Sequence, residues 1–137
     1  MSAPFEHSPY MRFLGLEVIA EEKGRFECRL PFRPEFLRHD DQDWLHGGVV
    51  SALIDIAGDH AAATEYGGVG LPTIDMRVDY LRPARRGDLV AVGRTVRAGR
   101  TVAVADVEVR DASGVLVAVG RAVYASPRPA APAERPA

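Results

Sequence analysis

The sequence contains little of what several classes of protein depend on. Its only cysteine, Cys28, excludes an internal disulfide framework and cannot build a thiolate metal site alone. No apolar run approaches the roughly 20 residues of a membrane-spanning helix, and residues 1–10 lack the apolar core of a signal peptide. The net charge of −2 provides no overall attraction to nucleic acid or to an anionic membrane. These absences favour a cytoplasmic protein.

The chain of 137 residues is long enough for one domain with a substantial core. Its composition, 47% hydrophobic and 26% charged, is that of an ordinary globular protein. We expect a single domain over residues 1–125, because the prolines and alanines of residues 126–137 are typical of a disordered tail.

The spacing of apolar residues predicts the elements of this domain. Steps of three and four residues predict a long helix, and alternation with a period of two predicts strands. Short turns between the last three strands favour antiparallel pairing. The order indicates an α+β fold in which an antiparallel sheet of five to six strands wraps around one central helix. The expected elements are a short helix at 9–15, strands at 16–20 and 25–30, an irregular stretch at 31–43, the long helix at 47–66, and strands at 73–80, 89–97, 101–110 and 115–124.

The most informative segment is the start of the long helix. His46 is followed by the glycine pair Gly47 and Gly48, and Asp55 stands further along the same helix among apolar residues. Glycine at a helix start lets a ligand approach backbone N–H groups that have no partner within the helix and carry its positive dipole end. A carboxylate among apolar residues is costly unless it is paired, protonated or used. Together these features indicate chemistry on a carbonyl group.

Asp55 follows His46 by nine positions, and the strand at 73–80 continues into Leu81, Arg82 and Pro83. With these motifs the chain resembles, over residues 10 to 125, the hotdog-fold acyl-CoA thioesterases of the phenylacetic-acid-degradation (PaaI-like) type. The resemblance implies a hotdog fold, an acyl-CoA substrate and a homodimer, with dimers often paired into tetramers. No cofactor is expected, because a thioester is already activated. No metal is expected either, because the sequence holds no recognisable metal-ligand motif.

The resemblance also implies roles for individual residues. The Gly47 N–H polarises the thioester carbonyl, and Asp55 activates water as a general base or attacks as a nucleophile. A Ser or Thr hydroxyl at the position of Thr73 helps to hold the water. His46 orders the loop or approaches the thioester sulfur.

Further candidates concern substrate binding. Gly48 belongs to the backbone that a ligand approaches. Asp40 stands where many relatives carry an asparagine that assists carbonyl binding, so an ionised Asp40 would oppose the charge that grows on the carbonyl oxygen. Arginine suits phosphate groups, and Arg82, Arg85 and Arg86 are therefore candidates for the nucleotide end of coenzyme A, although surface solubility explains any one of them equally well.

Helix geometry adds a prediction about assembly. Gly47 and Asp55 are eight residues apart, which corresponds to about 12 Å along a helix. One thioester carbon cannot contact both groups. If both act on it, they come from different subunits, with two such helices antiparallel across a two-fold axis.

Two alternative functions remain open at this stage. A hotdog dehydratase or hydratase acting on an acyl thioester pairs a histidine with an acid at other positions, and the sequence lacks a convincing second helix that carries such a pair. A non-catalytic acyl-CoA-binding module would gain nothing from Asp55. A further acid, Asp59, follows Asp55 by four residues, where the two carboxylates could couple or simply face solvent.

Overall fold

The computed structural model describes residues 7–127 as one antiparallel sheet that curves around one helix. Residues 1–6 of the expected domain and residues 128–137 of the expected tail lie outside the described residues. Ser126 is described and is buried, and its hydroxyl donates to the Gly99 carbonyl oxygen at 2.7 Å. The ordered chain therefore continues at least one residue beyond the boundary expected at 125.

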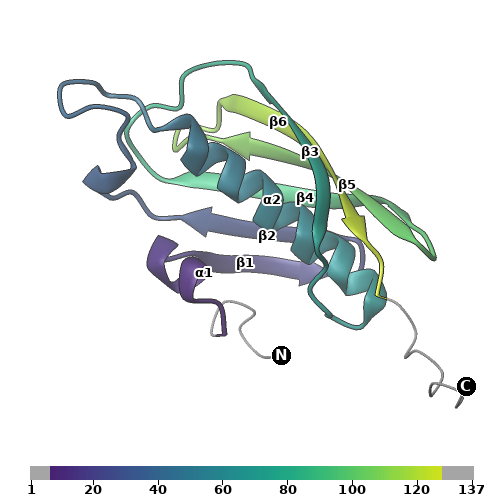
Figure 1. Ribbon diagram of the computed structural model, residues 1–137. Coiled ribbons are helices and arrows are strands. Elements are labelled where there is room, and N and C mark those ends of the chain that lie inside the picture. The colour runs from purple at the N-terminus through teal and green to yellow at the C-terminus, as the bar shows by residue number, and fades with distance from the viewer. Residues whose placement is uncertain (1–6, 128–137) are drawn as a thin grey trace, which may run out of the picture.

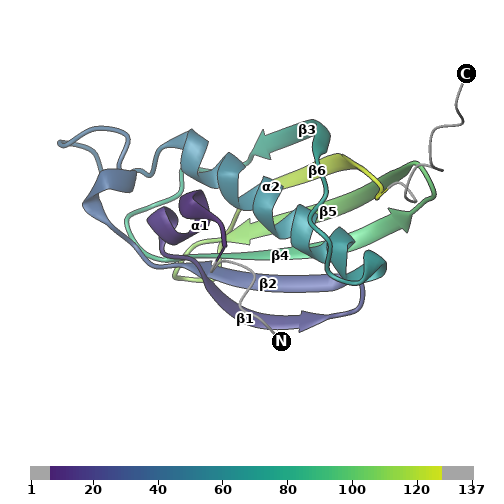
Figure 2. The ribbon, with the colours of Figure 1, turned by 60° about the horizontal axis from the view of Figure 1, so that its bottom comes forward.

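The strands form a six-stranded sheet in the order β1-β2-β4-β5-β6-β3, with α2 packed across its inner face (Figures 1 and 2). All five strand pairs are antiparallel. This confirms the expected α+β class. The elements are α1 (Pro9–Leu14), β1 (Glu17–Glu22), β2 (Arg25–Leu30), η1 (Pro34–Phe36), α2 (Gly47–Ala63), η2 (Thr64–Tyr66), β3 (Thr73–Tyr80), β4 (Leu89–Ala98), β5 (Val102–Arg110) and β6 (Leu116–Ala125).

Two boundaries differ from the expectation by two residues or more, and several others differ by one residue. The long helix is α-helical only to Ala63 and then tightens into the short 3₁₀ helix η2, which ends at Gly67 with a φ of 72°. The alanines before this point carry no stop signal, so the sequence pattern runs through to residue 66. Similarly, β1 continues to Glu22, because Gly24, with a φ of 80°, lets the chain reverse in a tighter turn than expected.

Small residues allow α2 to lie close to the sheet. Leu53 and Ile54 are fully buried against the strands. A Cβ on Gly93 of β4 would overlap the carbonyl oxygen of Ala57, and a Cβ on Gly120 of β6 would come within 2.6 Å of the Ile54 side chain. The glycines therefore permit the close approach that fixes the position of α2, and with it every residue that α2 carries.

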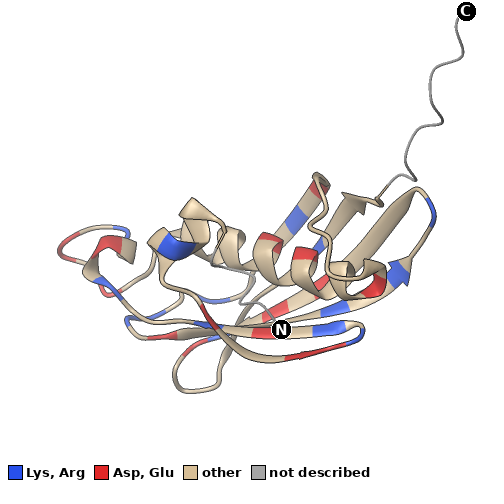
Figure 3. Cartoon of the chain, turned by 90° about the horizontal axis from the view of Figure 1, so that it is seen from below, with Lys and Arg blue, Asp and Glu red and all other residues tan. Residues whose placement is uncertain are grey.

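Charged residues of both signs are spread over the strands and loops of the described chain (Figure 3). Most of the ion pairs involve partly exposed side chains. The Arg121 guanidinium contacts both carboxylate oxygens of Asp106 across β5 and β6, at 2.6 and 2.9 Å. This pairing holds the pKa of the Asp106 carboxyl below its ordinary value, although burial acts in the opposite direction.

Candidate active site

The start of α2 is closed by a side-chain cap. His46 is the N-cap residue, and its Nδ1 accepts a hydrogen bond from the Gly48 N–H at 2.8 Å. Because Nδ1 accepts, the proton of the neutral ring lies on Nε2, which is then a donor. A Cβ on Gly48 would lie only 3.0 Å from His46 Nδ1. The histidine cap therefore explains why the second position carries no side chain. The same contact supports the expectation that His46 orders the loop.

Two hydroxyl groups fix the first peptide of the helix. The Tyr80 hydroxyl donates to the Gly47 carbonyl oxygen at 2.8 Å, and the Ser51 hydroxyl donates to the same oxygen at 2.9 Å. Among the described residues, the Gly47 N–H has no hydrogen-bond acceptor, whereas the Gly48 N–H is held by His46. The Gly47 N–H is thus the donor that remains for a ligand, at the positive end of the helix dipole.

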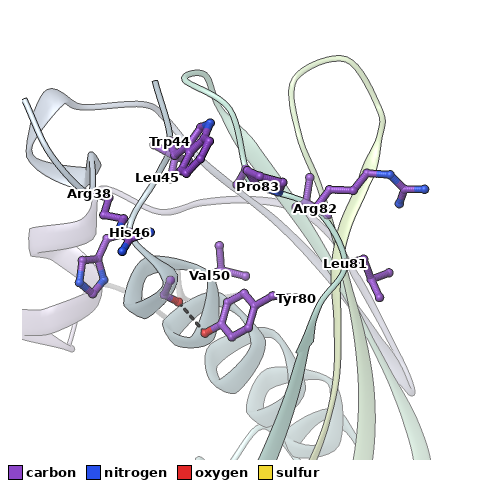
Figure 4. A pocket seen from close by; sticks show the side chains of 12 residues that line it. Arg38, Trp44, Leu45, His46, Val50, Tyr80, Leu81, Arg82 and Pro83 are labelled. Carbon is purple, nitrogen blue, oxygen red and sulfur yellow. Dashed lines mark hydrogen bonds between the residues drawn. The ribbon is translucent and has the colours of Figure 1, made fainter. Parts of the chain in front are cut away.

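This helix start opens into a pocket of about 510 Å³. Its wall includes His46, Gly47 and Tyr80, with the Tyr80 hydroxyl directed at the Gly47 carbonyl (Figure 4). Arg38 and Trp44 lie on the same side as His46, whereas the Arg82 side chain extends away from the helix start (Figure 4). The volume falls within the usual range for small-molecule sites. The remaining lining residues are Leu45, Val50, Leu81, Pro83, Ala84 and Val117.

The carboxylate lies elsewhere on α2, beside the start of β3. Asp55 is half-buried, and Thr73, the first residue of β3, donates its hydroxyl to Asp55 Oδ1 at 2.7 Å. The strand register shifts between Thr73 and Asp75, which is a local bulge at the point where Thr73 faces the helix. The structure therefore brings together the two residues expected to act on water.

Gly47 and Asp55 do not meet within one chain. Asp55 does not line the pocket at Gly47, and both residues belong to the single helix α2, which separates them by about 12 Å along its axis. Each chain thus carries an amide part at the helix start and a carboxylate part further along. This is the separation from which the sequence predicts a shared site.

The remaining candidates take different positions. Arg82 lines the pocket and donates from Nη1 to the Leu116 carbonyl oxygen at 2.9 Å. Arg85 stacks on the Trp44 ring, and Arg86 pairs with the Asp43 carboxylate at 2.9 Å. Those two arginines thus have structural contacts of their own. Asp40 is exposed in the loop before the helix and does not line the pocket.

Asp59 lies one helical turn beyond Asp55 but has a different partner. Its Oδ1 accepts a hydrogen bond from the Leu71 N–H at 2.9 Å. Burial raises the pKa of the Asp59 carboxyl above its ordinary value, and the charge of Asp55 adds to this, while the Leu71 N–H and His60 act in the opposite direction. Asp59 also borders a second hollow of about 640 Å³ near the end of α2.

Sequence reasoning missed the tyrosine and the serine at the helix start. Tyr80 closes the strand motif that carries the family resemblance, yet nothing in a strand pattern indicates that its hydroxyl binds a helix carbonyl 33 residues earlier. Ser51, four residues after Gly47, offered a weak signal, because serine in a helix often bonds to the preceding turn.

Residues 7–127 are the part of the chain to which the next two statements apply. No helix there combines the length and apolar character that crossing a lipid bilayer requires. Within the same residues, no group of three or more His, Cys, Asp or Glu side chains is arranged to hold a metal ion.

The sheet, the central helix and the bare helix start define a class of protein. The family model of the thioesterase superfamily matches residues 43–118, more than half of the chain. The chain therefore belongs to the thioesterase superfamily and has the hotdog fold of its solved members.

Particular relatives make the similarity more specific. The medium/long-chain acyl-CoA thioesterase YigI of Salmonella typhimurium is 33% identical over 132 residues, which cover 86% of this chain and 85% of YigI. A solved protein from the thioesterase superfamily is 37% identical, with a TM-score of 0.85 over 90% of this chain and 92% of that one. The Escherichia coli PaaI protein from the phenylacetic acid degradation operon is 23% identical, with a TM-score of 0.74 over 83% of this chain and 85% of PaaI. This last likeness is one of fold alone.

Proposed function

We propose that the protein is an acyl-CoA thioesterase of the PaaI-like type, which hydrolyses an acyl- or aryl-acyl-CoA to the free acid and coenzyme A. The observation that carries the proposal is the 2.7 Å hydrogen bond from Thr73 to Asp55, on the same helix whose first N–H is open at a pocket. The name of the relative YigI supports coenzyme A as the thiol part of the substrate. The hollow at the helix start supports a small-molecule substrate.

The proposed chemistry uses few groups. The thioester carbonyl oxygen accepts from the Gly47 N–H, which stabilises the negative charge of the tetrahedral intermediate. Asp55 takes a proton from a water molecule that Thr73 helps to orient, and the water oxygen bonds to the carbonyl carbon. The C–S bond then breaks, and the departing thiolate receives the proton. In the nucleophilic alternative, Asp55 attacks the carbon itself, and the C–S bond breaks to release the thiolate and leave a mixed anhydride. Water then hydrolyses the anhydride, and its proton passes to the thiolate.

The separation of Gly47 and Asp55 requires two chains in this proposal. The partner's copy of α2 would run antiparallel, so that the amide of one chain and the carboxylate of the other reach the same carbon. A homodimer is therefore the smallest active unit, and a dimer of dimers remains compatible with it. His46 Nε2–H would lie beside the sulfur, and Arg82, Arg85 and Arg86 are proposed to lie along the coenzyme A side.

The replacement Asp55→Asn tests the carboxylate. The variant keeps an oxygen that can accept from Thr73, so it should fold and bind acyl-CoA while losing at least about 100-fold in kcat. Thiol release from aromatic, short-chain and medium-chain acyl-CoAs is the assay. Asp59→Asn is the matched control, because it makes the same change one turn further along α2 and should retain most of the activity. Full turnover by Asp55→Asn would refute the proposal.

Subunit mixing tests the shared site. Gly47→Pro removes the N–H at a helix position that suits proline, and His46 already has the extended ψ of 137° that precedes a proline. Co-expressed with Asp55→Asn, it should yield heterodimers with one intact site, and therefore about a quarter of the wild-type activity if the chains mix at random. Each variant alone should be inactive. No recovery in a demonstrated heterodimer would contradict the two-chain site.

A further inference from the structure

Beneath the Asp55 and Thr73 pair lies a buried tyrosine that the proposed chemistry does not use. Tyr124 of β6 is 0% exposed, and its hydroxyl donates to the backbone carbonyl oxygen of Asp55 at 2.8 Å. In the sheet, Tyr124 is the direct β3–β6 partner of Thr73. One residue therefore contacts both the helix position of the carboxylate and the strand position of the hydroxyl that binds it.

The helix has a matching gap for this tyrosine. Gly58 lies in the interior of α2, where glycine weakens a helix relative to alanine. A Cβ on Gly58 would collide with the Tyr124 hydroxyl oxygen and lie 3.3 Å from its Cζ. Glycine at this position is thus explained by the space that the tyrosine needs, and the two residues fix how α2 lies on β6.

The contacts among Thr73, Tyr124 and Asp55 link each of the three residues to the other two. The Thr73 backbone pairs with Tyr124, the Tyr124 hydroxyl binds the Asp55 backbone, and the Thr73 hydroxyl binds the Asp55 carboxylate. We infer that Tyr124 is a positioning residue for the hydrolysis, which sets the distance and orientation between Asp55 and Thr73. This inference rests on the proposed function of Asp55. Tyr124 lines neither hollow, so it acts through the pair rather than on the substrate.

The environment keeps the tyrosine hydroxyl in its donor form. Burial raises the pKa of Tyr124 above its ordinary value, and the negative charges of Asp55 and Asp59 raise it further. The hydroxyl therefore stays protonated throughout the pH range of an activity assay. Catalytic groups misplaced by about 1 Å can lose a large part of their effect, so a shift of Asp55 relative to Thr73 should be visible in kcat.

The variant Tyr124→Phe removes the hydroxyl and keeps the ring. We expect kcat to fall by about tenfold and KM to stay within about twofold, because binding groups are untouched while the reacting pair loses its alignment. Tyr66→Phe is the matched control: the Tyr66 hydroxyl also donates to a backbone carbonyl, that of Gly99, at 2.6 Å, but it has no contact with Asp55 or Thr73. That control should keep its kcat.

A double-mutant cycle separates positioning from a general loss of structure. If Tyr124 acts through the Asp55 and Thr73 pair, Tyr124→Phe should lower kcat by less than about twofold in a Thr73→Ala background. A tenfold loss that persists in that background would overturn the inference. So would an effect of Tyr124→Phe on kcat no larger than that of Tyr66→Phe.

A second measurement does not depend on activity. Gly58→Ala should lower the midpoint of thermal unfolding, and it should lower it less when Tyr124→Phe has removed the oxygen with which the new methyl collides. Equal effects in both backgrounds would overturn the packing argument.

If Asp55→Asn keeps full turnover, the proposed function fails. If Asp55→Asn is inactive while Tyr124→Phe keeps its kcat, only the positioning role fails.

Discussion

Replacing Gly47 with alanine is expected to change stability and activity in opposite directions. Gly47 is the first residue of α2 and lies outside the left-handed region, so alanine can adopt its backbone conformation. The new Cβ would lie 3.5 Å from the Tyr80 ring, which is an ordinary packing distance. Because Tyr80 lines the pocket, the methyl group would project into the space where the proposed substrate carbonyl approaches the Gly47 N–H.

The two magnitudes follow from separate physical effects. Alanine is favoured over glycine by about 1 kcal/mol in a helix interior, and we take about half of this at the first helical position. A gain of about 0.5 kcal/mol raises the midpoint of thermal unfolding by about 2 °C in a domain of this size. Alanine keeps the N–H, but its methyl group would hold the substrate carbonyl away from it, and an oxyanion donor that cannot be reached costs about 100-fold or more in kcat. We therefore expect a slightly more stable protein with about 100-fold less turnover.

Urea unfolding and thiol release from acyl-CoA measure the two effects on the same preparation. Gly70→Ala is the control, since nothing lies within 4 Å of a Cβ at that position and the residue is exposed. It should leave kcat unchanged. A stabilised Gly47→Ala protein with full turnover would show that the substrate needs no bare backbone there. A loss of more than about 1 kcal/mol would refute the packing argument at Tyr80.

Two further predictions concern the core and the second acid. Because burial raises the pKa of the Asp59 carboxyl, the folded state holds that proton more tightly than the unfolded chain. This contribution to stability is present below about pH 4 and is lost as the pH rises through the folded pKa. The free energy of unfolding of Asp59→Asn in urea should therefore equal that of the wild type near pH 3 and exceed it toward neutral pH. A difference between the two proteins that stays constant with pH would contradict this. The methyl group of Gly93→Ala would overlap the Ala57 carbonyl oxygen, so this variant should lower the free energy of unfolding in urea by about 3 kcal/mol. A loss below about 1 kcal/mol would be inconsistent with the close approach of helix and sheet.

Most of the sheet could be predicted because its strands alternate cleanly. The strands at 25–30 and 73–80 were predicted at the bounds that the structure shows. In both sequences apolar residues alternate with a period of two. The strand at 25–30 buries its alternate residues, whereas the strand at 73–80 lies at the edge of the sheet and stays largely exposed. The end of the long helix was less predictable. Its alanine-rich second half fits an α-helix and a 3₁₀ turn equally well, and the change at Ala63 depends on contacts of the following residues.

The candidate site was predictable only where local sequence determines it. A glycine pair after His46 indicates an unusual helix start from residue types alone, and Asp55 is conspicuous among apolar neighbours. The partners of these groups come from distant strands. The hydroxyls of Tyr80 and Tyr124 bind helix carbonyls 33 and 69 residues away in sequence, and both tyrosines otherwise look like ordinary strand residues. Such contacts depend on register and on the closeness of the helix, which no short pattern encodes.

The close packing of α2 on the sheet has a consequence for the proposed acyl-CoA substrate. Gly93 contacts the helix backbone and Gly120 contacts Ile54, so at these two points no acyl chain fits between α2 and the sheet. Under the proposed function, an acyl chain would therefore lie along the flanks of the helix rather than beneath it at these points. Selection among acyl groups can then change through loop and surface residues, while the interior stays as it is.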